Sequence, residues 1–493
     1  MTSMIPASRP SLPVTAPSPQ VDPGRRERAQ RAYDLDLEYV FHSWLAQDGR
    51  DPFVVDGGQG SWLWDGDGRP YLDFSGQLVY TNIGFGHPRL VAAIAEQAAR
   101  LATVAPQHAN DQRSEAARLI VERAPGDRFR QVFFTNAGAD AIENAVRMAR
   151  VHTGRRKVIG RYRSYHGNTT TAINLTGDSR RWANDYGAEG VVHTFGPFLY
   201  RSAFHAQTES EECERALEHL EQVIALEGPG TIAAIVLESV PGTAGIMIPP
   251  AGYLRGVREI CDRYGIVWIA DEVMSGFGRC GRWFGCELAN EAPVGAAGAA
   301  GVAGGWAPVA GPDAVPDLIT FAKGVNSGYV PLGGVLISEE IAATFKQRAF
   351  PGGLTYSGHP LACAAAVANI GVLTDDKLID NADRLGREVF GPGLRALAGR
   401  SRLVGEVRGI GAFWALELVR DRETREPLVP AGAAGPANAP MATLARACRE
   451  RGLLPFINGN RTHVVPALNI TDEEARYGLA LLEEALAEVE STL

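Results

Sequence analysis

The sequence predicts an α/β fold with a mostly parallel sheet covered by helices, together with a smaller α+β domain. From about residue 130 onward, apolar segments typical of buried strands alternate with amphipathic segments typical of helices. Such alternation favours a parallel sheet, because each crossover places a helix on one face of the sheet. The chain has 493 residues, of which 45% are hydrophobic. It is therefore long enough for two or three domains and a sizeable core.

The elements follow one another in a regular order. Residues 61–74 predict a hairpin, because two aromatic-rich segments flank an Asp-Gly-Asp-Gly turn. Residues 87–101 have the apolar spacing of a helix, with Pro88 in its first turn. The elements predicted next are a strand at 130–136, a helix at 139–154, strands at 157–162 and 231–239, a helix near 252–264 and a strand at 265–273.

Changes in composition predict the boundaries between domains. The expected parts are a flexible arm at 1–30, the first part of the small domain at 31–85, a large domain at 86–364 and the rest of the small domain at 365–493. Residues 289–313 consist mostly of Ala, Gly, Val and Pro, which predicts a flexible insertion, with a short lid carrying Trp306 as the alternative. Residues 429–440 predict a second loop of this kind.

Charge and cysteine usage exclude several classes of function. The formal net charge is −9 and the chain has no long basic stripe, which argues against nucleic acid as a partner. No apolar run approaches the roughly 18 residues that a membrane-spanning helix needs, and no secretory signal is visible. The six cysteines are scattered, as in proteins of a reducing compartment, so we expect a cytoplasmic protein. Cys280 and Cys286 lack a second nearby ligand pair, so no metal site is expected.

Three features fall at predicted carboxyl ends of strands, where parallel sheets bind ligands. Ala137, Gly138 and Ala139 lie between a strand and a helix, where backbone N–H groups favour an anion. Asp271 and Lys323 each follow an apolar strand. Taken singly, these features equally fit a steric turn, a helix cap and a solvated loop lysine. Together they match what pyridoxal 5′-phosphate requires: a site for phosphate, an acid for the ring nitrogen and an amine for the Schiff base.

Six motifs in the same chain resemble the class III aminotransferases, the ω-aminotransferase branch of the fold-type I pyridoxal-phosphate enzymes. The resemblance extends from about residue 40 to about residue 485. The motifs are TNAGADAIENAVRMAR, YRSYHG, IADEVMSGFGRCG, ITFAKGVNSGYVPLGG, TYSGHPLACAAAVA and VRGIGAFWALEL.

The resemblance implies a role for each matching residue. Lys323 would form the Schiff base and shuttle the proton, and Asp271 would keep the pyridine nitrogen protonated. Arg408 would bind the substrate carboxylate. Thr355 would reach the phosphate of the partner subunit, so the active unit would be a homodimer, with a tetramer of two dimers left open. The other residues implied near the cofactor are Ala137, Gly138, Ala139, Tyr165, His166, Glu238, Val273 and Met274, and the candidate pocket residues are Val79, Tyr80, Trp62 and Phe85.

The sequence departs from the family pattern at three places. Ala137 and Ala139 replace serines of the phosphate loop, which predicts weaker cofactor retention. Met274 stands where many relatives have a glutamine and cannot donate its hydrogen bond. Thr243 stands where some relatives have a glutamate that pairs with the arginine. Without that glutamate Arg408 would have no built-in gate, so it could swing away to admit an uncharged or ω-charged donor and return for a 2-oxo acid. This favours pyruvate as the amino acceptor over 2-oxoglutarate.

The function that the resemblance implies is transamination. The amine donor would be an ω-amino acid, such as β-alanine or taurine, or a simple primary amine, and the acceptor would be a 2-oxo acid. An aminomutase or a decarboxylating transaminase would carry the same six motifs and is the alternative. A cofactor-binding regulator is a second alternative, although residues 1–30 are too short and too proline-rich for an added DNA-binding module.

Overall fold

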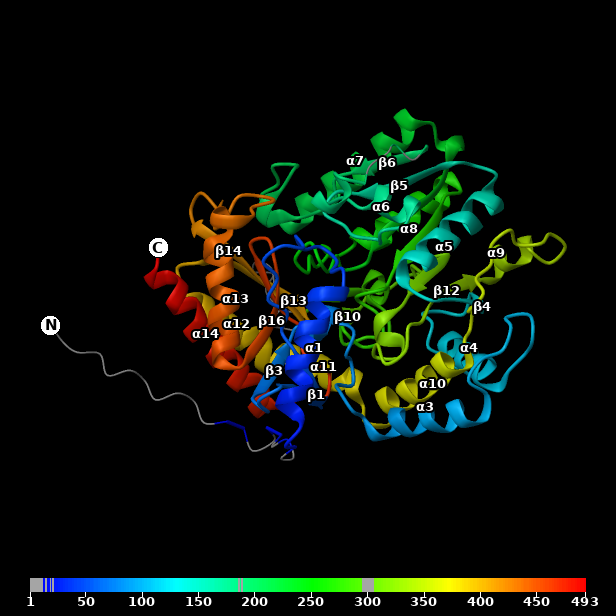
Figure 1. Cartoon of the computed structure of the whole chain (residues 1–493). Helices are drawn as coiled ribbons and strands as arrows, with labels where there is room; N and C mark the ends of the chain where they lie inside the picture. Colours follow the sequence, from blue (N-terminus) through cyan, green and yellow to red (C-terminus); the bar gives the residue numbers. More distant parts are fainter. Residues whose placement is uncertain are drawn as a thin grey trace.

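In the computed structural model of the chain, two sheets form two centres of packing (Figure 1). The structure describes residues 12, 13, 16, 17, 19, 22–184, 187, 189–294 and 306–493. The α-helices are α1 (Arg25–Tyr39), α2 (Gly76–Val79), α3 (Pro88–Leu101), α4 (Asp111–Glu122), α5 (Gly138–Thr153), α6 (Thr170–Leu175), α7 (Glu209–Glu227), α8 (Tyr253–Tyr264), α9 (Glu339–Thr344), α10 (Pro360–Asp375), α11 (Leu378–Leu385), α12 (Gly391–Arg400), α13 (Ala439–Arg451) and α14 (Asp472–Ser491).

The mostly parallel sheet has seven strands in the order β4-β12-β11-β8-β7-β5-β6. Their bounds are β4 (Phe129–Thr135), β5 (Lys157–Arg161), β6 (Val191–Thr194), β7 (Ile232–Glu238), β8 (Val267–Asp271), β11 (Leu318–Phe321) and β12 (Gly333–Ser338). All neighbouring pairs are parallel except those that β12 makes with β11 and β4. Apolar side chains of α5 pack on one face and those of α8 on the other. The predicted α/β fold with a mostly parallel sheet is confirmed.

The second sheet joins both ends of the chain. Its strands are β1 (Val55–Gln59), β2 (Trp62–Asp65), β3 (Pro70–Phe74), β16 (Leu453–Asn458), β17 (Arg461–Val464), β14 (Phe413–Asp421) and β13 (Val404–Ile410), with β15 (Glu426–Pro427) beside β14. β3 and β16 run parallel, although about 380 residues separate them in the sequence. Apolar residues of α12, α13 and α14 fill the core against this sheet, and these helices lie together on its outer side in Figure 1.

Two segments that were expected to be flexible carry regular structure. Helix α1 begins at Arg25, inside the predicted arm, and the Arg25 guanidinium pairs with Asp56 at 2.9 Å. The described ends of the predicted insertion form β9 (Glu291–Pro293) and β10 (Trp306–Pro308), which pair antiparallel. Trp306 packs on the large core, so this part of the insertion is not a free loop. Residues 295–305, the middle of that insertion, lie outside the described residues.

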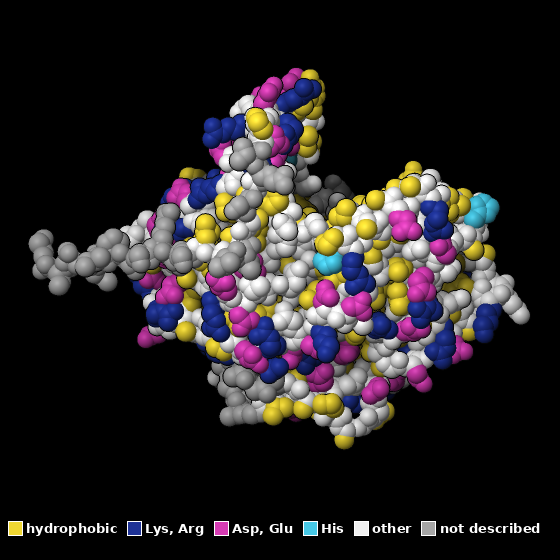
Figure 2. All heavy atoms as spheres, turned by 90° about the horizontal axis from the view of Figure 1, so that it is seen from below, with side chains coloured by type: hydrophobic (Ala, Val, Ile, Leu, Met, Phe, Trp, Pro, Cys, Tyr) yellow, Lys and Arg dark blue, Asp and Glu magenta, His cyan; other side chains and the backbone are white. Residues whose placement is uncertain are grey.

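The surface mixes both signs of charge. On the face seen in Figure 2, Lys and Arg side chains lie among Asp and Glu side chains and small hydrophobic areas. None of the helices described has both the length and the apolar character to cross a membrane.

Candidate active site

The carboxyl ends of β7, β8 and β11 bring the predicted acids and the predicted lysine together. Glu238 is directly opposite Asp271 in the β7–β8 pairing, and Asp271 is opposite Thr320 in the β8–β11 pairing. Lys323 follows three residues after Thr320. The register therefore places Glu238 and Asp271 side by side, and Lys323 reaches the same edge because neighbouring parallel strands end there.

The Lys323 amine has an environment that favours its neutral form. The side chain is largely enclosed, and this burial lowers the pKa of Lys323 to about 8, although the charges of Asp271 and Glu238 act in the opposite direction. The backbone of Lys323 has a φ of +50°, which a residue with a Cβ rarely adopts. An amine with such a pKa is a nucleophile and a proton carrier near neutral pH.

Asp271 is held by its neighbours at the end of β8. Its carboxylate accepts a hydrogen bond from the backbone N–H of Val273 at 3.0 Å and lies 2.7 Å from Nδ1 of His166. Burial alone would lower the pKa of His166, but the hydrogen bond and charge of Asp271 outweigh it, so the pKa is raised. A protonated His166 would balance the carboxylate and fix its orientation.

Glu238 orders the segment that carries Tyr165. Its two carboxylate oxygens accept hydrogen bonds from the N–H groups of Tyr165 at 2.9 Å and Gly242 at 2.8 Å. Burial raises the pKa of Glu238. A residue that the sequence did not single out, Arg180, lies over the Tyr165 ring, with Cζ 3.6 Å from the ring centroid. Arg180 is itself paired with Asp178, with Nε–oxygen distances of 3.0 and 3.1 Å.

The turn from β4 into α5 supplies the anion site. Ala137 is the N-cap of α5 and its side chain makes no capping bond, so the first N–H groups of the helix have no side-chain acceptor there. A Cβ on Gly138 would lie 2.9 Å from both Cγ atoms of Val273, so only glycine lets this turn approach the end of β8 so closely.

These features fit pyridoxal phosphate. The uncapped start of α5 suits the phosphate, Asp271 suits the ring nitrogen and Lys323 suits the aldehyde. The hydroxyl of Thr243 points to the sulfur of Met274 at 3.6 Å, and both lie beside the segment that follows β7. Thr355 lies on the exposed loop before α10, in the same turn region as the exposed Tyr356.

Thr243 supplies no carboxylate to Arg408, but two other acids hold its guanidinium in place. Its guanidinium pairs with Glu417 at 2.7 Å and with Glu406, and its Nε donates to the carbonyl of Gly245. Burial alone would lower the pKa of Arg408, but the charges of Glu417 and Glu406 raise it. These acids come from β13 and β14; Glu417 lies in the same motif as Arg408, VRGIGAFWALEL, but the motif alone does not show that the two side chains pair.

The four candidate pocket residues do not share one place. Tyr80 packs on Gly328, shortly after Lys323, while Val79 is buried in the large core. Phe85 is partly buried, and its carbonyl accepts the N–H of Gly60. The prediction that Trp62 lines the substrate pocket is wrong. Trp62 is 2% exposed in the core of the second sheet, where its Nε1 donates a hydrogen bond to Glu474 at 2.6 Å. A side chain committed to that core does not line the substrate site.

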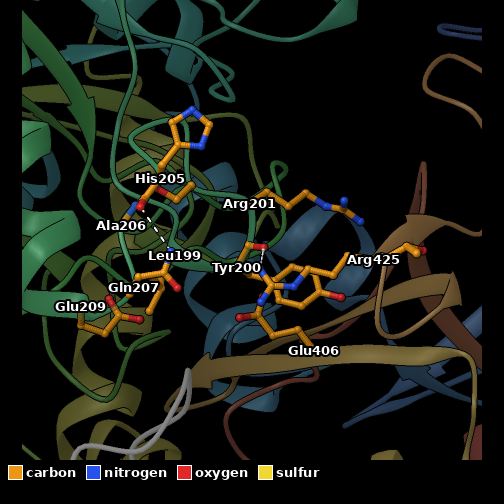
Figure 3. Close-up of a pocket in the computed structure, with 11 residues that line it drawn as sticks. Leu199, Tyr200, Arg201, His205, Ala206, Gln207, Glu209, Glu406 and Arg425 are labelled. Atoms are coloured by element: carbon orange, nitrogen blue, oxygen red, sulfur yellow. Dashed lines mark hydrogen bonds between the residues drawn. The ribbon is translucent and has the colours of Figure 1, made fainter.

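A cavity of about 540 Å³ is lined in part by Arg201 and Glu406 (Figure 3). The segment that contains Leu199, Tyr200, Arg201 and His205 forms one side of it, and Glu406 and Arg425 come from the second sheet. Lys323 and Asp271 are not among the residues that line it. Glu406 lines this cavity and also pairs with Arg408.

All six cysteines are buried and unpaired. The described part of the chain has no group of three His, Cys, Asp or Glu side chains placed to hold a metal ion.

Comparisons with known proteins agree with this geometry. The family model of the class-III aminotransferases matches residues 45–311 and 294–486. The 5-aminovalerate aminotransferase DavT of Pseudomonas aeruginosa is 32% identical, covering 89% of this chain and 94% of its own. Gamma aminobutyrate transaminase 3 of Solanum lycopersicum, a chloroplastic protein, is also 32% identical, covering 92% of this chain and 85% of its own.

A solved structure is similar over nearly the whole length. The taurine:2-oxoglutarate aminotransferase of Bifidobacterium kashiwanohense, in complex with pyridoxal phosphate and glutamate, is 37% identical with a TM-score of 0.86, covering 94% of this chain and 99% of its own. The site and these comparisons lead to one conclusion: the chain belongs to the class III aminotransferases, which are pyridoxal-phosphate enzymes.

Proposed function

We propose that the protein transfers the amino group of an ω-amino acid to a 2-oxo acid, with the Lys323 amine as the reacting group. The observation that carries the proposal is the enclosed Lys323 amine with a pKa of about 8 beside Asp271 and Glu238. The relatives named for 5-aminovalerate, gamma-aminobutyrate and taurine support this donor class. Each of those compounds has an amine at one end and an acid group at the other.

Each residue of the proposed active site has a separate role in the transfer. Bound pyridoxal phosphate supplies an aldehyde that takes up the amino group and a ring that withdraws electrons. Nζ of Lys323 removes the proton from the donor carbon and returns it during the transfer. Asp271, oriented by His166, holds a positive charge at the ring nitrogen. The N–H groups at the start of α5 hold the phosphate.

The choice of pyruvate as the amino acceptor, which was based on the sequence, has to be revised. Pyruvate was favoured because Arg408, with no gate at Thr243, was expected to swing freely, whereas Glu406 and Glu417 hold its guanidinium here. The proposal therefore names a 2-oxo acid, and pyruvate is one of two acceptors to compare. The active unit is proposed to be a homodimer in which Thr355 of each subunit reaches the phosphate of the other, because Thr355 is exposed in the single chain.

The test is spectroscopic. Purified protein is loaded with cofactor, mixed with 4-aminobutyrate, 5-aminovalerate, taurine or β-alanine, and then given pyruvate or 2-oxoglutarate. Visible absorbance that is lost with a donor and restored by an acceptor supports the proposal, and product analysis identifies both substrates. Turnover of a donor without any acceptor would instead show a mutase. Lys323→Ala should abolish the cycle, while the exposed Lys346→Ala should leave it intact.

A further inference from the structure

Three strands of the second sheet carry a row of charged side chains. Glu406 on β13 is paired in the register with Glu417 on β14, and Glu417 is paired with Arg461 on β17. Side chains directly opposite each other on neighbouring strands lie on the same face of a sheet. Arg408 is two residues beyond Glu406 and therefore lies on that face as well. One face thus presents two arginines and two glutamates.

This face meets the segment that follows β7. A Cβ on Gly245 would lie 2.4 Å from Nη2 of Arg408 and 2.5 Å from Cδ of Arg461. The backbone of Gly245 has a φ of +117°, so a larger residue would be excluded by strain as well as by space. Both arginine side chains therefore pass the same point of the segment that begins at Glu238.

The two arginines differ in their partners. Arg408 is bonded to Glu406, Glu417 and the Gly245 carbonyl. Among the residues that the structure describes, the side chain of Arg461 has no hydrogen bond or ion pair, and its Nε is buried without an acceptor. Burial lowers the pKa of Arg461, although the charge of Glu417 opposes this. A largely enclosed guanidinium without a partner is costly, and an anionic ligand would remove that cost.

The charges around Arg461 do not balance. Arg201 approaches Glu417 at 3.3 Å, and Arg408 pairs with both glutamates. Three guanidinium groups, those of Arg201, Arg408 and Arg461, thus share two carboxylates. The charges of Glu417, Arg201 and Arg461 also act on Arg163, which adds a fourth guanidinium. The cluster therefore has more positive than negative charge, and a carboxylate or sulfonate would reduce the excess.

Arg180 connects this cluster with the reacting amine. Its charge lowers the pKa of Lys323 and also acts on Arg461. Arg180 is balanced by Asp178, so it is not the group that needs an anion. An anion at Arg461 would lie apart from the Lys323 amine, as does the acid group at the far end of an ω-amino acid.

We propose that Arg461 binds the distal anionic group of the substrate: the carboxylate or sulfonate of an ω-amino acid donor, and the second carboxylate of a dicarboxylic 2-oxo acid. The inference rests on the proposed function and specifies its substrate site. Pyruvate has no distal acid group and gains nothing from Arg461. Dicarboxylic 2-oxo acids are therefore the preferred acceptors.

The test compares Arg461→Met, Arg461→Lys and the control Arg420→Met in the cofactor-loaded enzyme. Arg420 lies on β14 of the same sheet but is exposed. KM and kcat are measured with an ω-amino acid and with a primary amine that has no acid group. Binding of glutarate and of propane-1-sulfonate, which cannot react, is measured by calorimetry.

Arg461→Met should raise KM for the ω-amino acid and weaken glutarate binding by roughly tenfold or more. The kcat/KM for the plain amine should not change. Arg461→Lys should recover part of both losses, and Arg420→Met should cause neither. Arg461→Met should unfold at the same temperature as the parent or higher, because it removes an unpaired buried charge.

Unchanged glutarate binding in Arg461→Met would overturn the inference, as would an equal loss of activity toward the plain amine. Because glutarate binding needs no turnover, it still decides the role of Arg461 if no donor is transaminated. In that case the proposed transamination would be refuted, while the role of Arg461 in binding anions would be decided separately by the glutarate measurement.

Discussion

Nδ1 of His166 lies 2.7 Å from a carboxylate oxygen of Asp271, at a place where both side chains are at most 4% exposed. The pair is the structural basis for keeping a charged acid at the end of an apolar strand. We expect His166→Phe to leave the Asp271 carboxylate with one backbone donor, and to lower the free energy of unfolding by about 3 kcal/mol. Thermal or urea unfolding measures this loss.

The control for that change is His166→Asn, which keeps a donor at a similar distance. It should lose less stability and retain more cofactor than His166→Phe. Equal stability of the two variants would show that the hydrogen bond to Asp271 contributes nothing beyond packing.

The Lys323 amine predicts how cofactor uptake depends on pH. Its pKa is about 8, below the ordinary value of 10.5, because burial disfavours the charged form. Only the neutral amine attacks an aldehyde, so the rate of pyridoxal-phosphate uptake by cofactor-free protein should rise about tenfold per pH unit below pH 8 and level off above it. Rapid-mixing absorbance measures the rate. A plateau reached only near pH 10 would contradict the lowered pKa.

The uncapped start of α5 predicts that adding a capping residue will make the protein retain its cofactor longer. Ala137 occupies the N-cap and offers no acceptor or hydroxyl. Ala137→Ser should provide a cap worth about 1 kcal/mol to the helix and a hydroxyl for the phosphate. Cofactor should therefore dissociate several-fold more slowly in dialysis against buffer. Ala434→Ser, at the N-cap of the short 3-10 helix (Gly435–Asn438) that precedes α13, should leave the dissociation rate unchanged.

The positions of the site residues that lie at strand ends could be predicted from the sequence. Asp271 and Lys323 each terminate an apolar run, and a parallel sheet collects such ends at one edge. The carboxylate partners of Arg408 were missed because their contact depends on the register of antiparallel strands, which no local pattern encodes. Trp62 was misplaced for a similar reason, because its partner Glu474 is 412 residues away.

The ion pair between Arg408 and Glu417 should make stability depend on pH. Burial alone would raise the pKa of Glu417, but the charges of Arg408 and Arg461 lower it below the ordinary value of 4.5. A carboxyl group whose pKa is lowered by folding stabilises the folded state above its unfolded pKa and loses that contribution as the pH falls through its folded pKa.

Glu417→Gln should therefore reduce stability at pH 7 by a few kcal/mol, because it leaves Arg408 with one carboxylate and Arg461 with none nearby on β14. The difference between parent and variant should shrink as the pH falls below about 4.5, where the parent also loses the charge of Glu417. Unfolding curves from pH 3 to pH 8 test this course. Glu426→Gln is the matched control, because its pairing with Arg420 is exposed and should contribute little at any pH. A parent–variant difference that stayed constant across that range would show that Glu417 acts through packing rather than through its charge.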